Sequence, residues 1–297
     1  MKLYYRISDK SYEKQKLLGA TKEVCLTNFC RVFEKIIFEN VENPNVIPPI
    51  RIIADRCSRD TLKMLRSTGI PLIITDYGNA GSLRYALDLA IKENQDDELV
   101  YFCEDDYLHL DNAPIFLQEG IKRADYVTLY DHPDKYTSMY DGGEISKVIK
   151  TTSSHWRYTA STCMTFGTKV KTLKDDMEIW NEFISGDHPH DHFIFRKLSE
   201  EKKRRLIVCI PGVACHTDLT FSGRVHHVLI DPWAIEMMIH QREHDIEQCS
   251  FSKSESFQQL KESMIKERTG WNRLVALDAL FKQYSVQDSI DNKMSIS

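Results

Sequence analysis

The sequence predicts an α/β protein with a mostly parallel sheet flanked by helices. Short apolar runs alternate with amphipathic segments through the first hundred residues, in the order β-α-β-α-β-α-β. Several of these apolar runs end in acidic or polar residues, and ligands of open α/β sheets bind beyond the carboxyl ends of the strands. The length of 297 residues fits one large domain with an appendage.

Four strands and three helices are expected before residue 104. The apolar runs predict strands at 3–7, 50–54, 71–75 and 98–103. Thr21 and Ser58 are suitable N-caps for the first two helices, and the first helix runs to about residue 39. Gly78 to Gly81 is expected to form a turn, after which Ser82 opens a helix to about residue 92. Neither G-x-G-x-x-G nor a P-loop sequence occurs, which argues against those two nucleotide sites.

The later part of the chain mixes strands with helices and ends in helices. Strands are expected at 124–130, 155–166 and 206–210, with helices at 174–184 and 193–198. Asp231 and Pro232 predict the start of a helix to about residue 248, followed by helices at 254–268 and 271–284. We therefore predict a sheet domain at 1–222, a C-terminal helical extension at 223–284 and a disordered tail at 285–297. The extension could pack on the sheet or assemble a homo-oligomer.

Three consecutive acids follow the predicted strand at 98–103. Leu99 to Cys103 is apolar and leads directly into Glu104, Asp105 and Asp106. Because adjacent carboxylates repel one another, a fold that places them together usually has a cation to hold. Oxygen ligands favour Mg²⁺ or Mn²⁺. The alternative is a solvated acidic turn after a strand.

This Glu-Asp-Asp sequence resembles the metal-binding Asp-x-Asp motif of GT-A glycosyltransferases. Two other segments resemble the family-2-type members: Asp55-Arg-Cys-Ser-Arg-Asp-Thr61 after the second strand, and Asn79-Ala-Gly-Ser82 before the third helix. The resemblance spans about residues 1–222. It implies a GT-A fold and transfer of a sugar from a nucleoside-diphosphate sugar, with UDP favoured, to a glycan or polysaccharide acceptor. Arg56 and Cys57 depart from the pattern, because many relatives have Asp and Gly there.

The resemblance also implies roles for individual residues. Asp106 matches the direct metal ligand, and His216, which follows a late strand and a Pro-Gly turn, matches an imidazole ligand that would favour Mn²⁺. Glu104 would lie near the ribose or hold a metal-bound water, and Asp105 would orient the sugar.

Three residues near the first strands are candidates for binding the nucleotide. Asp55 could accept a hydrogen bond from the base or ribose, or could instead cap a helix. Asp9 could touch the base from the end of the first strand, and Asn79 belongs to the turn that carries the resemblance.

A second polar cluster, His188, His190, Asp191 and His192, precedes a helical pattern. The resemblance makes Asp191 the catalytic base of an inverting enzyme, although His190 stands where relatives have Glu. Imidazole and carboxylate are also zinc ligands, so a metal-dependent hydrolase built on this cluster is an alternative. A non-catalytic sugar- or nucleotide-binding module on the same fold is another.

Composition and charge exclude several classes of protein. The net charge is −5 and no basic patch suits a nucleic-acid backbone. The eight cysteines lie mostly in apolar runs without CxxC pairs, which is typical of a reducing compartment. No signal peptide is recognisable, and Pro211-Gly212 interrupts the longest apolar run. A cytoplasmic protein without a transmembrane segment is therefore expected.

Overall fold

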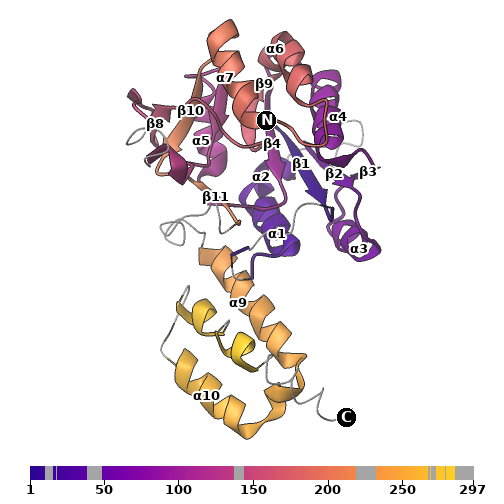
Figure 1. The fold of residues 1–297 in the computed structure, drawn as a ribbon, viewed down its shortest axis with the longest axis vertical. Helices are drawn as coiled ribbons and strands as arrows, with labels where there is room; N and C mark the ends of the chain where they lie inside the picture. The colour runs from indigo at the N-terminus through magenta and orange to yellow at the C-terminus, as the bar shows by residue number, and fades with distance from the viewer. Residues whose placement is uncertain are drawn as a thin grey trace.

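The computed structural model describes residues 1–10, 16–17, 19–38, 49–136, 144–218, 232–266, 268, 272–277 and 279–284. Within these residues, a nine-stranded sheet is flanked by helices on both faces (Figure 1). The strand order is β3-β2-β1-β4-β9-β6-β10-β8-β7. The α/β class, with a mostly parallel sheet flanked by helices, is confirmed.

The first half of the sheet has the predicted alternation of strands and helices. β1 (Lys2–Ser8) pairs in parallel with β2 (Ile50–Asp55) and β4 (Leu99–Glu104), and β2 pairs with β3 (Leu72–Thr75). The connecting helices are α1 (Lys22–Val32), α2 (Glu34–Ile37), α3 (Arg59–Ser67) and α4 (Gly78–Glu93). The single helix predicted to residue 39 is broken at Phe33.

One helix begins earlier than the sequence indicated. α4 starts at Gly78, so the prediction of a turn to Gly81 was wrong. Asp55 accepts hydrogen bonds from the backbone N–H groups of Tyr77 and Gly78, which satisfies donors that a helix start leaves open. Gly78 has φ +76°, a conformation that glycine adopts without strain.

Two strands in the second half of the sheet run antiparallel to both of their neighbours. β9 (Phe166–Lys169) lies antiparallel between β4 and β6 (Tyr126–Thr128), and β10 (Leu206–Ile210) runs parallel to β6. β8 (His155–Tyr158) and β7 (Val148–Lys150) complete the edge as an antiparallel pair. The strand predicted at 155–166 is therefore two strands. The chain leaves the sheet between them, and in this segment Thr162 donates to the Thr128 hydroxyl and Thr159 donates to the Ser161 carbonyl.

A small second sheet, which the sequence did not predict, joins distant parts of the chain. β5 (Tyr107–His109) pairs antiparallel with β11 (Ala214–His216), and His216 lies opposite Tyr107. The remaining elements of the sheet domain are α5 (Ala113–Gly120), η1 (Pro133–Tyr136), α6 (Val170–Phe183) and α7 (Asp191–Lys202). This pairing brings His216 beside the acids that follow β4.

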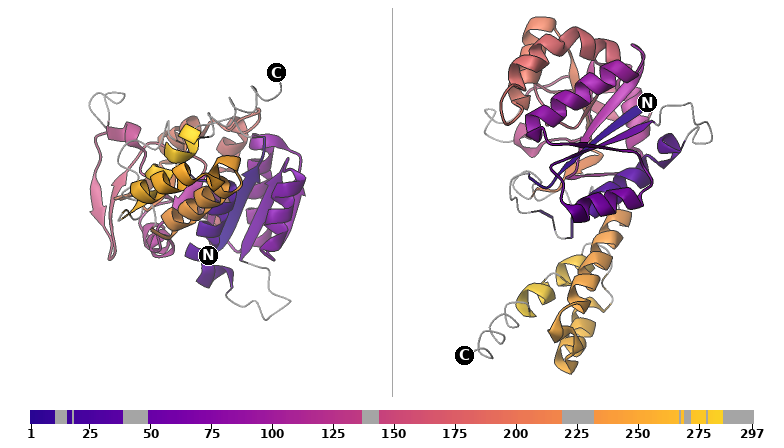
Figure 2. Two further views of the ribbon diagram at one scale, coloured as in Figure 1. Left: turned by 90° about the horizontal axis from the view of Figure 1, so that it is seen from below. Right: turned by 90° about the vertical axis from the view of Figure 1, so that its right-hand side faces the viewer.

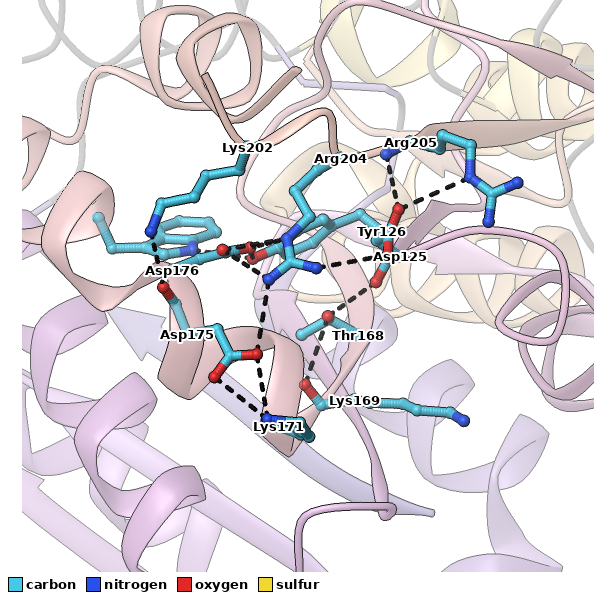
Figure 3. A network of polar contacts seen from close by, with 11 residues as sticks. Asp125, Tyr126, Thr168, Lys169, Lys171, Asp175, Asp176, Lys202, Arg204 and Arg205 are labelled. Carbon is cyan, nitrogen blue, oxygen red and sulfur yellow. Dashed lines mark hydrogen bonds and ion pairs between the residues drawn. The ribbon is translucent and has the colours of Figure 1, made fainter. Parts of the chain in front are cut away.

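Both faces of the sheet are packed. One apolar cluster includes α1 and α5, and the other includes α4, α6 and α7. A charged network lies on the second face (Figure 3). Asp176 is fully buried and accepts hydrogen bonds from Arg204 Nε and Nη2, each at 2.9 Å, and from the Tyr126 hydroxyl at 2.9 Å. Because helices cover both faces of the sheet, a ligand site is expected at the carboxyl ends of the strands.

The C-terminal helices form a separate bundle beside α1 (Figures 1 and 2). It contains α9 (Pro232–Glu247), η4 (Ser250–Lys253), α10 (Glu255–Ile265) and helical residues at 272–277 and 279–284. Met238 of α9 and Val24 of α1 belong to one continuous apolar cluster. The helices predicted here are confirmed, whereas the cap at Asp231, the boundary at 222/223 and the tail at 285–297 lie outside the described residues. No described helix combines the length and the apolar surface that crossing a bilayer requires.

Candidate active site

A cavity of about 870 Å³ lies at the carboxyl ends of the central strands. Ser8 of β1, Asp55 of β2 and Glu104 of β4 line it, each at the end of its strand. The cavity is also lined by α4, the segments at 161–164 and 186–189 and the start of α7, together with His132, Lys135 and His216. The predicted position of the site, at this edge of the sheet, agrees with the cavity.

Each acid of the triplet has a partner from a different element. Glu104 Oε1 lies 3.4 Å from Arg6 Nη1 of β1, and Asp105 is paired with Lys22 of α1. Asp106 Oδ2 lies 3.4 Å from His216 Nε2 of β11. The side chain of Asp105 is 10% exposed and that of Asp106 is 13% exposed. These contacts exclude a solvated acidic turn.

Burial and mutual repulsion make it costly for Glu104 and Asp105 to carry their negative charges. Burial raises the pKa of Glu104 to about 7; Arg6 opposes this shift, and the neighbouring Asp106, Asp105 and Asp191 add to it. Burial also raises the pKa of Asp105, against the effect of Lys22. Negative charge crowded in this way would be relieved by a divalent cation.

The side chains around Asp106 supply only some of the ligands that a hard cation needs. A carboxylate oxygen and an imidazole nitrogen face each other across 3.4 Å, and Mg²⁺ or Mn²⁺ commonly adds water and phosphate oxygens to so few protein ligands. However, His216 Nδ1 accepts the backbone N–H of Asp218 at 3.1 Å, so the proton of a neutral ring is on Nε2, toward Asp106. His216 can bind a metal through Nε2 after that contact with Asp106 is released and the ring changes tautomer. In the described part of the chain, no three His, Cys, Asp or Glu side chains form a ready-made metal cluster.

The predicted nucleotide residues have different positions in the structure. Asp55 lines the cavity but accepts three hydrogen bonds from the turn before α4, namely the N–H groups of Tyr77 and Gly78 and the Thr75 hydroxyl. Asp9 accepts the Ser58 N–H at the start of α3 and does not line the cavity. The capping alternative therefore describes the contacts of Asp55 in this structure.

Arg6 is a functional candidate that sequence reasoning missed. Its Nη2 donates at 2.7 Å to both the Asn79 side-chain and backbone oxygens, and at 3.1 Å to Ser82 Oγ. It is 7% exposed and lines the cavity. Asn79, which was predicted, is thus held at the cavity by Arg6. A charged residue inside the apolar run of β1 was the available signal.

Asp191 begins α7 and lines the same cavity as the triplet. Burial raises its pKa, while its bond from the His192 N–H and the nearby His192 and His132 rings oppose the rise. His188 and His192 also line the cavity, whereas His190 is the residue before the helix. The predicted base is therefore in the same cavity as the candidate metal ligand.

Comparisons with known proteins establish no family. No family model matches, and no curated protein matches. Among solved structures, the galactosyltransferase LgtC in complex with donor and acceptor sugar analogues has a TM-score of 0.36 and 11% identity, over 66% of this chain and 69% of that one. The inositol-1-phosphate CTP transferase from T. maritima has a TM-score of 0.40 and 13% identity, over 82% and 97%. TarS from S. aureus has a TM-score of 0.36 and 15% identity, over 89% and 71%. Similarities at this level carry no argument about the activity of this chain.

Proposed function

We propose that this protein is a metal-dependent glycosyltransferase. It would move a sugar from a nucleoside-diphosphate sugar, with UDP favoured, to a glycan or polysaccharide acceptor. The observation that carries the proposal is the meeting of Glu104, Asp106, His216 and Asp191 in one cavity at the carboxyl ends of parallel strands. A carboxylate cluster for a cation and a separate, partly buried carboxylate for a proton are the two devices that this transfer needs.

The proposed role of each residue follows from its position in the cavity. Asp106, with His216 once their mutual contact is released, would hold Mn²⁺ or Mg²⁺, which supplies charge neutralisation for the leaving diphosphate. Arg6 holds Asn79 and Glu104 on the side of the cavity near β1 and α4, where the nucleotide would bind. Asp105 is fixed by Ser8 N–H and Lys22, so it would orient the sugar from a rigid position.

Asp191 would take the proton from the attacking acceptor hydroxyl. A carboxylate whose pKa is raised by burial is a better base than an exposed one. Its place at the start of α7 keeps a backbone N–H on its oxygen, which orients the side chain. A base acting opposite the leaving group gives a product with inverted anomeric configuration.

The rival functions have weaker support. A zinc hydrolase at His188–His192 needs several converging ligands, and the described residues contain no such cluster of three. A non-catalytic binding module would bind the donor without consuming it, so turnover separates it from an enzyme.

The test combines ligand screening with one matched pair of variants. A thermal-shift panel of UDP-, GDP-, dTDP- and CMP-sugars with Mn²⁺ should show stabilisation by one nucleotide class. Asp106→Ala should lose nearly all nucleotide release in the presence of acceptor, whereas Asp97→Ala, at an exposed acid outside the cavity, should keep it. Near wild-type turnover by Asp106→Ala after EDTA treatment and Mn²⁺ addition would rule out this metal site.

A further inference from the structure

The small sheet of β5 and β11 lies between two apolar clusters. Tyr107 belongs to a cluster of the main sheet, whereas Leu108 and Cys215 belong to the cluster that contains the C-terminal helices. This division follows from the alternation of side chains along a strand, since successive residues point to opposite faces. Asp106 directly precedes β5, and His216 is the last residue of β11. The two strands that carry the candidate metal ligands are therefore packed, on one face, in the apolar cluster of the C-terminal bundle.

The bundle reaches this cluster through a close contact between α9 and Gly19. Met238 of α9 is fully buried, and α9 packs against α1 (Figure 1). A Cβ atom at Gly19 would lie 2.8 Å from Met238 Cβ and 3.0 Å from the Met238 carbonyl oxygen. Gly19 also has φ +68°, in the left-handed region that favours glycine. The turn before α1 therefore fits against α9 only with glycine at this position.

Backbone hydrogen bonds connect the same turn to the candidate metal ligands. The Ala20 N–H donates to the Leu17 carbonyl at 3.0 Å, which closes the turn. The Leu17 N–H donates to the Thr217 carbonyl at 2.7 Å, and the Thr217 N–H donates to the Asp106 carbonyl at 2.8 Å. Thr217 directly follows His216 in the chain. The backbone positions of Asp106 and His216 are thus tied to the turn that contacts α9.

The start of α1, directly after this turn, holds a further acid of the site. Lys22, the first residue of α1, is paired with Asp105 and also donates to the Ser8 carbonyl. Two residues later, Val24 is buried in the same apolar cluster as Met238. α1 contacts both β5 and α9. The third acid and the candidate metal ligands therefore depend on one segment, and that segment packs against α9.

We propose that Met238 is a positioning residue for the metal side of the site, although it does not line the cavity. It acts through Gly19 and Thr217, which fix the small sheet against the main sheet. The role in metal binding rests on the proposed function. Asp106 Oδ2 and His216 Nε2 lie 3.4 Å apart, and a shared cation needs both side chains at a set distance, so a loosened strand pair binds it less well. Loss of the Met238 contact should therefore weaken binding of nucleotide with metal and spare binding of nucleotide alone.

Hydrogen exchange of the whole protein tests the positioning without any ligand. Met238→Ala should accelerate exchange of the backbone amides at 106–109 and 214–217 about threefold to tenfold, while the amides of β1 and β4 exchange as in wild type. Phe257→Ala is the matched control, because Phe257 is equally buried in the same cluster but its ring contacts are with Phe251 and Tyr284, inside the bundle. It should leave the small sheet unchanged, and Met238→Leu, which keeps the side-chain volume, should exchange as wild type does. Equal exchange of the small sheet in Met238→Ala and Phe257→Ala would overturn the proposal.

Calorimetry with UDP connects the positioning to the site. Met238→Ala should weaken binding of UDP with Mn²⁺ about threefold to tenfold and leave binding of UDP alone unchanged, and Met238→Leu should bind both as wild type does. If Met238→Ala melts early, Gly19→Ala carries both measurements, because its methyl group displaces the turn without removing a buried side chain.

The two measurements separate this inference from the proposed function. Faster exchange with unchanged affinity for UDP and Mn²⁺ would overturn the positioning role and leave the glycosyltransferase in place. Faster exchange in a protein that binds no nucleotide would keep Met238 as the residue that positions the small sheet and reject the glycosyltransferase.

Discussion

A buried histidine should make this protein sensitive to acid. His109 of β5 is 1% exposed, its Nε2 lies 2.7 Å from the Tyr101 hydroxyl, and no hydrogen-bond partner to Nδ1 is found among the described residues. The rings of Phe29, Phe33 and Tyr101 surround it. An imidazolium needs acceptors on both nitrogens, so burial lowers the pKa of His109 to about 3.

The size of the effect follows from this pKa. The unfolded chain has an ordinary histidine pKa of about 6.5 and therefore binds the proton more tightly than the folded protein. The stability that His109 contributes is complete above pH of about 6.5 and is lost as pH falls toward about 3. At pH of about 5, one and a half units below the unfolded value, the loss is about 2 kcal/mol.

Urea denaturation of wild type and His109→Phe at pH of about 7.5 and about 5 measures this loss. Phenylalanine keeps the apolar contacts and removes the titrating group, so the free energy of unfolding should fall by about 2 kcal/mol less between the two pH values than in wild type. His155→Gln, at an exposed histidine of β8, should behave as wild type. An identical pH-dependent loss in His109→Phe would refute the assignment.

The remaining site predictions concern three residues of the cavity. Asp55→Ala should lower the free energy of unfolding by about 1–3 kcal/mol, because it leaves three donors between β3 and α4 without their acceptor. Unchanged urea denaturation would reject the capping role of Asp55, and calorimetry with UDP measures any contact with the nucleotide. His216→Ala should weaken binding of UDP with Mn²⁺ more than binding of UDP alone, and equal losses would remove His216 from the coordination shell. Asp191→Asn should abolish transfer but spare binding of donor and metal; proton NMR of the first product formed should show inversion, and retention of the donor configuration would contradict the role of Asp191.

The sequence was most informative where an apolar strand ends in polar residues. That pattern by itself placed Asp55 and Glu104 at one edge of the sheet, and the edge carries the cavity. The pattern was uninformative for β5 and β11, because strands of three residues are too short to show alternation. The contact between Asp106 and His216 depends on the pairing of these two strands, so only the family resemblance pointed to it.

The contact between Lys135 and Ser161 could not be predicted for a related reason. Lys135 lies in a short 3-10 turn and Ser161 in an irregular segment, so neither belongs to a periodic pattern. Their meeting depends on Glu144, which binds both segments through its backbone and side chain. Such long-range bracing through single polar contacts leaves no local signal in the sequence.

The pairing of the acids indicates that folding does not depend on a bound cation. Glu104 contacts Arg6, Asp105 contacts Lys22 and Asp106 contacts His216, so each carboxylate already has a protein partner. We therefore expect EDTA to stop transfer and to leave the Tm of the nucleotide-free protein unchanged, since a cation that binds few protein groups adds little to folding. Thermal melts with EDTA and with Mn²⁺, alongside activity with each, measure both quantities. A large drop in Tm on chelation would show that the cation is part of the folded core, and the triplet would then be a structural site.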